Sequence, residues 1–164
     1  MSGRKRRSDR DQRRRSLSQH FLVDQTLISK LIDDLEIVGD ELVVDVGAGS
    51  GALTLPLAHK GARVWAVERD PIWADQLTAH ATAARLDDRI RVIRTDVRRF
   101  RFPRERFRII ANPPFSLTTD ILKLILDDPT SSSPTRADLV LQREVTLKHA
   151  SQPPKALKTA SWSP

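Results

Sequence analysis

The segment with the clearest chemical use is Asn112-Pro113-Pro114-Phe115, which directly follows the apolar run 107–111. The side-chain carbonyl of Asn112 and the backbone carbonyl of Pro113 can accept hydrogen bonds from an exocyclic NH2 group, and the ring of Phe115 can stack on the base that carries it. Such an arrangement suits chemistry at N6 of adenine. A turn at the end of a strand is the simpler interpretation of Asn-Pro and Pro-Pro, and the segment alone supports both equally.

A glycine-rich segment upstream, Gly47-Ala48-Gly49-Ser50-Gly51, shifts this balance. It lies between a Val-rich run and a helical pattern, so its backbone amides would face a ligand at the positive end of a helix. The segment also fits the Gly-x-Gly-x-x-Ala pattern of dinucleotide-binding folds, so a nicotinamide-dependent oxidoreductase is an alternative on these residues.

Two acidic residues end the next two predicted strands. Glu68 comes 21 residues after Gly47 and suits ribose hydroxyls, and Asp96 can accept a hydrogen bond from an adenine amino group. In an open parallel sheet the carboxyl ends of the strands lie along one edge, where ligands bind. We therefore expect both acids to converge with Gly47 and Asn112 on one pocket.

The elements that would position these residues alternate between strand and helix. Strands are expected at residues 41–46, 63–67, 90–94, 107–111 and 139–142. A first helix should begin after an N-cap at Asp24 and end at Gly39, and further helices are expected at residues 50–60, 71–86 and 117–127. The alternation predicts an α/β fold with a mostly parallel, doubly wound sheet. Residues 128–135 should form a loop and residues 156–162 one more strand.

The net charge of +7 is concentrated in two blocks. Residues 1–15 carry a net +6, and residues 91–108 carry eight arginines against two acids, again +6. Such blocks predict polyanion binding, and the second should place positive charge beside Asn112. A disordered solubilising tail is the alternative for residues 1–15, with one domain at residues 16–164. The arginines expected to bind RNA are Arg4, Arg6, Arg7, Arg13, Arg14, Arg15, Arg98, Arg99 and Arg101.

Composition argues against several classes of protein. The chain has no cysteine and its four histidines show no ligand spacing, so we expect neither thiol chemistry nor a metal site. No apolar run reaches membrane-spanning length, and no hydrophobic segment follows the basic N-terminal residues. We therefore expect a cytoplasmic protein without a signal peptide or membrane anchor.

Taken together, these motifs resemble those of Rossmann-like class I S-adenosyl-L-methionine-dependent N6-adenine methyltransferases. Gln19-His20-Phe21-Leu22, ahead of the first helix, resembles a signature of the rRNA adenine dimethyltransferase superfamily, which includes the Erm macrolide-resistance enzymes and the small-subunit dimethyladenosine transferases. Asn-Pro-Pro-Phe-Ser-Leu-Thr-Thr, residues 139–144 and the Arg-rich leader resemble the Erm branch of actinobacterial type. The resemblance covers residues 16–164.

The resemblance implies a role for each matched residue. S-adenosyl-L-methionine would be held by Gln19, His20, Leu22, Gly47, Gly49, Glu68, Asp96 and Asn112. Among these, His20 stands where Asn is common, Glu68 would bind the ribose hydroxyls and Asp96 the adenine amino group. Asn112 and Pro113 would orient the target amine, and Phe115 would stack on the flipped base.

The activity implied is methyl transfer to N6 of an adenine in 23S rRNA or its precursor, with macrolide resistance, by a monomer that binds no membrane. The alternatives are a 16S rRNA dimethyltransferase, a DNA N6-adenine methyltransferase and a non-catalytic RNA-binding module. Superfamily members normally continue with a final strand and a small helical domain that helps to hold rRNA. Their absence here predicts weaker RNA affinity than that of a full-length member, with cofactor binding retained and a sheet edge left unpaired.

Overall fold

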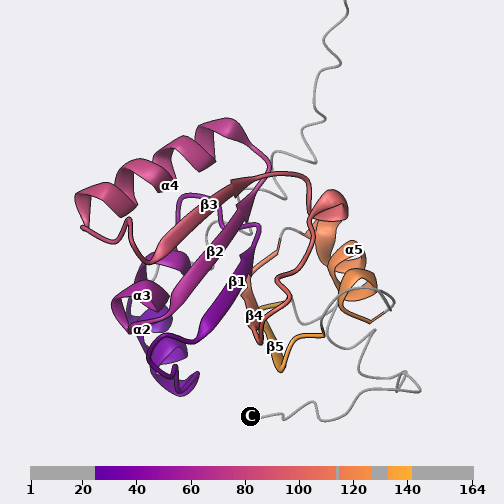
Figure 1. Cartoon of the computed structure of the whole chain (residues 1–164), viewed down its shortest axis with the longest axis horizontal. Coiled ribbons are helices and arrows are strands. Elements are labelled where there is room, and N and C mark those ends of the chain that lie inside the picture. The colour runs from indigo at the N-terminus through magenta and orange to yellow at the C-terminus, as the bar shows by residue number, and fades with distance from the viewer. Residues whose placement is uncertain (1–24, 114, 127–132, 142–164) are drawn as a thin grey trace, which may run out of the picture.

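The computed structural model describes residues 25–113, 115–126 and 133–141 (Figure 1). Strands and helices alternate along this part of the chain. In order they are α2 (Gln25–Asp34), β1 (Leu42–Val46), α3 (Thr54–His59), β2 (Arg63–Glu68), α4 (Pro71–Ala83), β3 (Ile90–Arg94), the 3-10 turn η1 (Val97–Arg99), β4 (Arg108–Ala111), α5 (Phe115–Leu126) and β5 (Arg136–Leu139).

The five strands form one parallel sheet in the order β3-β2-β1-β4-β5. Central β1 is buried along its whole length, as expected for a Val-rich strand covered on both faces. Val44 of β1 pairs with Trp65 of β2 on one side and with Ile109 of β4 on the other. The chain winds outward from β1 in both directions, which confirms the predicted doubly wound α/β fold.

Helices cover both faces of this sheet (Figure 1). On one face, α2, α3 and α4 bury Ile32, Leu57 and Leu77 against β1 and β2. On the other face, α5 packs through Ile121 beside a row of aromatic rings from the segment between η1 and β4. In that row Phe102 stacks on Phe107 with ring centroids 5.0 Å apart. The two cores enclose the sheet from both faces. The parallel pairing of the strands brings their carboxyl ends to one edge of the sheet.

Several element boundaries differ from the sequence prediction. Helix α2 ends at Asp34 instead of Gly39, because Glu36 has a φ of 48°, which no α-helix can accommodate. Helix α4 ends three residues early for the same reason, since Arg85 has a φ of 57°. The 3-10 turn η1 was not predicted. Strand β5 begins at Arg136, three residues before the predicted start.

Some predictions fall on residues outside the described part of the chain. These are the basic tail at residues 1–15, the N-cap at Asp24, the segment 19–22 and the strand at residues 156–162. Within the described ranges, none of the helices combines the length and the apolar character that crossing a membrane would need.

Candidate active site

The predicted functional residues of the sheet lie at the carboxyl ends of adjacent strands. Strands β3, β2, β1 and β4 are neighbours and all parallel, so their carboxyl ends share one edge. Glu68 ends β2, and Gly47, Asp96 and Asn112 follow β1, β3 and β4. Hydrogen bonds tie these ends together: the Gly47 amide donates to the carbonyl of Val67 over 2.8 Å, and the Thr95 amide to the carbonyl of Glu68 over 3.2 Å.

Two glycines of the loop after β1 have different surroundings. Gly49 has a φ of +56°, and a Cβ built on it would meet no atom within 4 Å. Gly51 has a φ of +100°, and its Cβ would come within 2.5 Å of Leu77 Cδ1 on α4. Both conformations suit glycine. Gly49 therefore borders open space beside the strand ends, whereas Gly51 lets the loop press against helix α4.

Glu68 is fixed by the backbone of two segments. Its Oε2 accepts from the Gly49 amide over 2.9 Å, and its Oε1 accepts from the Asp70 amide over 2.7 Å. Each carboxylate oxygen has two lone pairs, so one acceptor position per oxygen is left for a pair of hydroxyl groups. Glu68 thus sits against the glycine loop as a rigid acceptor, which is compatible with the predicted ribose contact.

Asp96 is held by two arginines. Its Oδ1 accepts from the backbone amide and from Nε of Arg98, each over 3.0 Å, and its Oδ2 accepts from Nη2 of Arg98 over 2.9 Å. Nη1 of Arg69 adds a longer contact of 3.4 Å to Oδ2. The hydrogen bonds from Arg98 hold the pKa of Asp96 well below its usual range. The carboxylate is therefore ionised and fixed in direction.

Asp45, on β1 beneath the glycine loop, was not singled out by the sequence analysis. It is buried in the strand, and Thr54 Oγ1 donates to its Oδ2 over 2.6 Å. Burial raises the pKa of Asp45 to about 7, and the nearby negative charge of Glu68 acts in the same direction. In the sequence, Asp45 is recognisable as an acid inside the apolar run Leu-Val-Val-Asp-Val. When a strand is buried on both faces, an acidic side chain in it cannot reach solvent.

The proposed clamp for the target amine lies at the same edge. Asn112 is the first residue after β4 and is half-buried, and Pro113 is buried. Phe115 begins α5, but its side chain and Pro114 fall outside the described part, as do Gln19, His20 and Leu22.

The arginine cluster at residues 91–108 does not lie as a whole beside the site. Arg98 and Arg99 belong to η1, at the carboxyl edge of the sheet. Glu105, in contrast, accepts from Nη2 of Arg63 over 2.7 Å, and Arg63 is the first residue of β2. Only the first part of the block lies at the edge that holds Asn112, because residues 100–107 carry the chain back to the amino edge of the sheet, where β4 begins.

The last arginine of this block, Arg108, is buried, with only 4% of its side chain exposed. Its Nε donates to Asp138 of β5 over 2.7 Å, and its Nη1 donates to the carbonyl of Leu35 over 2.7 Å. Glu41 lies 3.8 Å away. Arg108 therefore joins β4, β5 and the end of α2, and it is not available to nucleic acid.

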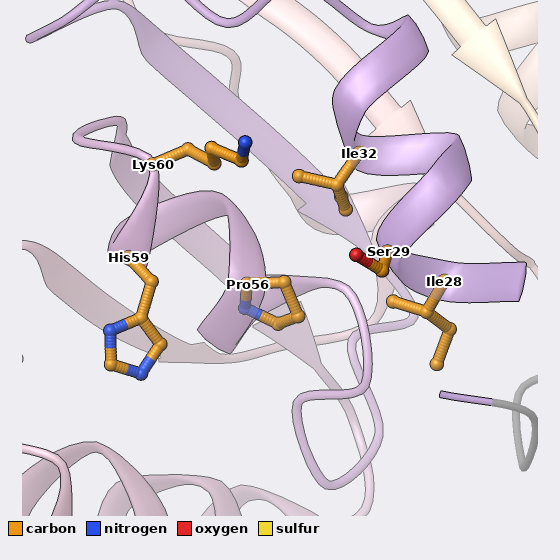
Figure 2. Close-up of a pocket in the computed structure, with 6 residues that line it drawn as sticks. All are labelled: Ile28, Ser29, Ile32, Pro56, His59 and Lys60. Carbon is orange, nitrogen blue, oxygen red and sulfur yellow. The ribbon is translucent and has the colours of Figure 1, made fainter. Parts of the chain in front are cut away.

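A separate pocket of about 310 Å³ lies between α2 and α3 (Figure 2). Its lining residues are Ile28, Ser29, Ile32, Pro56, His59 and Lys60. They include none of the residues at the strand ends, and Lys60 is paired with Asp33 on α2 over 2.5 Å. Among the described residues, no group of three or more His, Asp or Glu side chains could hold a metal ion.

Comparison with known proteins gives the site a family context. The family model described as ribosomal RNA adenine dimethylase matches residues 10–160. An rRNA adenine N-6-methyltransferase of Corynebacterium diphtheriae is 36% identical over 89% of this chain, and the ribosomal RNA small subunit methyltransferase A of Geobacter metallireducens is 33% identical over 85%. The crystal structure of the 23S rRNA methyltransferase ErmE superposes with a TM-score of 0.65 at 28% identity, over 78% of this chain.

The chain spans about half the length of these proteins. It covers 54% of the Corynebacterium relative, 52% of the Geobacter relative and 50% of the ErmE chain. The range matched by the family model, residues 10–160, includes the whole described sheet and the loops at its carboxyl edge.

Proposed function

The chain belongs to the ribosomal RNA adenine dimethylase family, and from this premise we propose that it transfers methyl groups from S-adenosyl-L-methionine to N6 of an adenine in 23S rRNA. Within the family we assign it to the Erm branch of actinobacterial type, whose activity confers macrolide resistance. The single observation that carries the proposal is the convergence of the glycine loop, two carboxylates and Asn112 on one edge of the sheet.

The residues at this edge fit S-adenosyl-L-methionine. The open space beside Gly49 admits a ligand close to the backbone, and the two free acceptor positions of Glu68 match a pair of ribose hydroxyls. The ionised Asp96 is an acceptor for an adenine amino group. When bound, the cofactor supplies an electrophilic methyl group on a sulfonium ion. Gln19, His20 and Leu22 would complete the proposed set, with His20 and Leu22 at the methionine end of the cofactor.

Asn112 and Pro113 would act by alignment. The lone pair of an adenine amino group is delocalised into the ring, so the group is a weak nucleophile. Two carbonyl acceptors favour the geometry in which that lone pair points at the methyl group, and alignment of this kind supplies a large part of a barrier reduction. Phe115 would stack on the extruded base. The proton released on transfer can pass to water, so the mechanism needs no acid or base side chain.

The proposed RNA-binding surface combines exposed arginines at the carboxyl edge of the sheet with the basic residues 1–15. Arg99 and Arg101 are exposed just after the end of β3 and in the segment that follows it, whereas Arg98, also exposed, is paired with Asp96. Residues 1–15 would add further basic groups to a catalytic domain at residues 16–164, in a monomeric cytoplasmic protein. Basic groups placed in this way bind phosphates without reading sequence.

A 16S rRNA dimethyltransferase is the second candidate, because the Geobacter relative acts on the small subunit by its name. Methylation of 23S rRNA, 16S rRNA and duplex DNA, side by side with a radiolabelled donor, separates the candidates. We expect label in 23S rRNA at an adenine identified by mass spectrometry, and reduced macrolide susceptibility in cells that express the chain. Label in 16S rRNA alone would assign the chain to the other branch.

Substitution of Asn112 tests the mechanism. Asn112→Ala should lower methyl transfer by about 100-fold or more, since alignment is lost, while RNA binding stays unchanged. Transfer at the wild-type rate would favour a non-catalytic role for the site. Calorimetry with S-adenosylhomocysteine against NAD excludes or supports the oxidoreductase alternative, and tight NAD binding would overturn the assignment.

A further inference from the structure

Arg98 is bound to the carboxylate that the proposed function assigns to the adenine ring of the cofactor. Three donors of this one residue, its backbone amide, Nε and Nη2, contact both oxygens of Asp96 over 2.9–3.0 Å. The guanidinium and the carboxylate therefore form a bidentate ion pair, which fixes the orientation of the carboxylate and keeps it ionised. Nε of Arg98 also lies 3.8 Å from a carboxylate oxygen of Asp120 on α5, a second acid that favours this position of the guanidinium.

The hydrogen bonds leave a defined place for one more donor. A carboxylate oxygen accepts two hydrogen bonds well, and both positions of Oδ1 are taken by Arg98. Oδ2 takes one close bond from Arg98 and the longer contact of 3.4 Å from Arg69, whose side chain is 53% exposed. A donor from a ligand can replace Arg69 at low cost, while the pair with Arg98 stays intact. Arg98 thus leaves Oδ2 as the acceptor.

We infer that Arg98 is a positioning residue for cofactor specificity: its guanidinium holds the Asp96 carboxylate so that Oδ2 accepts the amino group of an adenine base. The inference rests on the proposed function and extends it to a residue that the sequence analysis had placed on the RNA surface. It also explains why an exposed arginine at this edge is paired with acids instead of standing free for phosphate.

The test compares binding of S-adenosylhomocysteine with binding of its inosine analogue, in which a keto oxygen replaces the amino group. The variants are Arg98→Ala, Arg98→Lys and Asp96→Asn, with Arg94→Ala as the matched control. Arg94 is an exposed arginine four residues away that pairs with Asp75 on α4. Substitution at residue 98 keeps its backbone amide, so the bond that caps η1 survives and the turn should still form.

We expect the wild type to favour the adenine compound by about tenfold or more, the size expected for a lost charge-assisted hydrogen bond. Arg98→Ala and Asp96→Asn should each lose most of this preference by weakening adenine binding, with little change for the inosine analogue. Arg98→Lys should retain part of the preference for the adenine compound, since lysine keeps the positive charge but cannot form a bidentate pair. Arg94→Ala should behave as the wild type.

Two results would overturn the inference while the proposed function stands. Wild-type preference in Arg98→Ala would mean that Asp96 needs no positioning, and tighter adenine binding in that variant would mean that Arg98 competes for the carboxylate. A wild type that binds neither compound would overturn the proposed function itself, and the inference with it. Thermal unfolding of each variant checks that the domain is folded.

Discussion

Carboxylates near the strand ends are tuned in opposite directions by their surroundings. Asp45 is enclosed by the sheet, and burial moves its pKa to about 7, whereas the pKa of Asp96 is lowered by hydrogen bonds from Arg98. Glu68 lies between them, bound by two backbone amides. The site therefore combines a buried acid, Asp45, that protonates near neutral pH with an ionised acceptor, Asp96, and only the latter suits a permanent contact to a polar ligand.

The raised pKa of Asp45 predicts how stability depends on pH. The folded state binds the proton more tightly than the unfolded chain does, so the contribution of Asp45 is most favourable below pH 4 and is lost as pH rises through about 7. The shift from 3.8 to about 7 corresponds to about 4 kcal/mol, at about 1.36 kcal/mol per unit. Asp45→Asn, which does not titrate, should therefore gain stability relative to the wild type as pH rises from about 4 to about 7, and the difference should then stay constant.

Urea unfolding at a series of pH values measures this difference. The exposed Asp34→Asn serves as the control, and its free energy of unfolding should follow that of the wild type. A difference between Asp45→Asn and the wild type that is the same at every pH would show that Asp45 does not titrate in this range.

At the scale of single elements, the two glycines of the loop after β1 should affect different properties: Gly51 the stability of the fold and Gly49 the binding of ligand. Gly51→Ala would force a Cβ to within 2.5 Å of Leu77 Cδ1 and 3.2 Å of Leu55 Cγ, at a φ of +100°. We expect it to lose about 2–4 kcal/mol of stability, the range for strain combined with overpacking. Gly49→Ala meets no atom and should cost about 1 kcal/mol for its positive φ.

For ligand binding we expect the reverse order, with a larger effect of Gly49→Ala than of Gly51→Ala. The methyl group of Gly49→Ala would occupy the open space proposed for the cofactor, so affinity for S-adenosylhomocysteine should fall by about tenfold or more, as for a lost close contact. Urea unfolding and calorimetry on both variants provide the two readouts. If a folded Gly49→Ala variant bound S-adenosylhomocysteine with unchanged affinity, the cofactor would have to bind elsewhere than beside this loop.

Strand β5 is joined to β4 by a partly buried ion pair as well as by backbone pairing. Arg108 of β4 is buried and binds Asp138 of β5 and the carbonyl of Leu35. Arg108→Met should cost about 3 kcal/mol, because Asp138 and the carbonyl lose their buried donor. Arg136→Gln is the matched control: Arg136 also pairs with Asp138, over 2.8 Å, but is 48% exposed. This surface pair should contribute less than about 1 kcal/mol, and equal losses in urea unfolding would contradict the assignment.

The sequence predicted the elements whose position depends on an apolar pattern. Strand β3 has the predicted bounds, and β1 and β2 differ from theirs by one residue. Strand β5 was misplaced because Arg136-Ala137-Asp138-Leu139 contains no apolar run, and its pairing with β4 leaves no local pattern in the sequence. The contact of Asp45 was missed because its partner, Thr54, lies nine residues further along the chain. Arg98 lies only two residues from Asp96, and its pairing was missed because Arg98 was grouped with the arginines expected to bind RNA.

At the scale of the whole molecule, charge is divided between the two edges of the sheet. The net charge of +7 favours contact with polyanions, but the block at residues 91–108 contributes to both edges and, through Arg108, to the core. Arg99 lies at the carboxyl edge with the proposed site, and Arg106 lies just before β4 at the amino edge. An RNA substrate presented to Asn112 would therefore contact the first arginine and not the second.

This division gives a prediction with an internal control. Arg99→Gln and Arg106→Gln remove the same charge from exposed side chains of one sequence block. If the target base enters at the carboxyl edge, Arg99→Gln should lower RNA affinity and reduce the slope of log affinity against log salt by about 0.7, as for one phosphate contact to a single strand. Arg106→Gln should change neither quantity, because its edge faces away from the RNA. Filter binding of an rRNA fragment over a range of salt concentrations measures both, and equal effects of the two substitutions would show that the chain binds RNA through its overall charge and not through this edge.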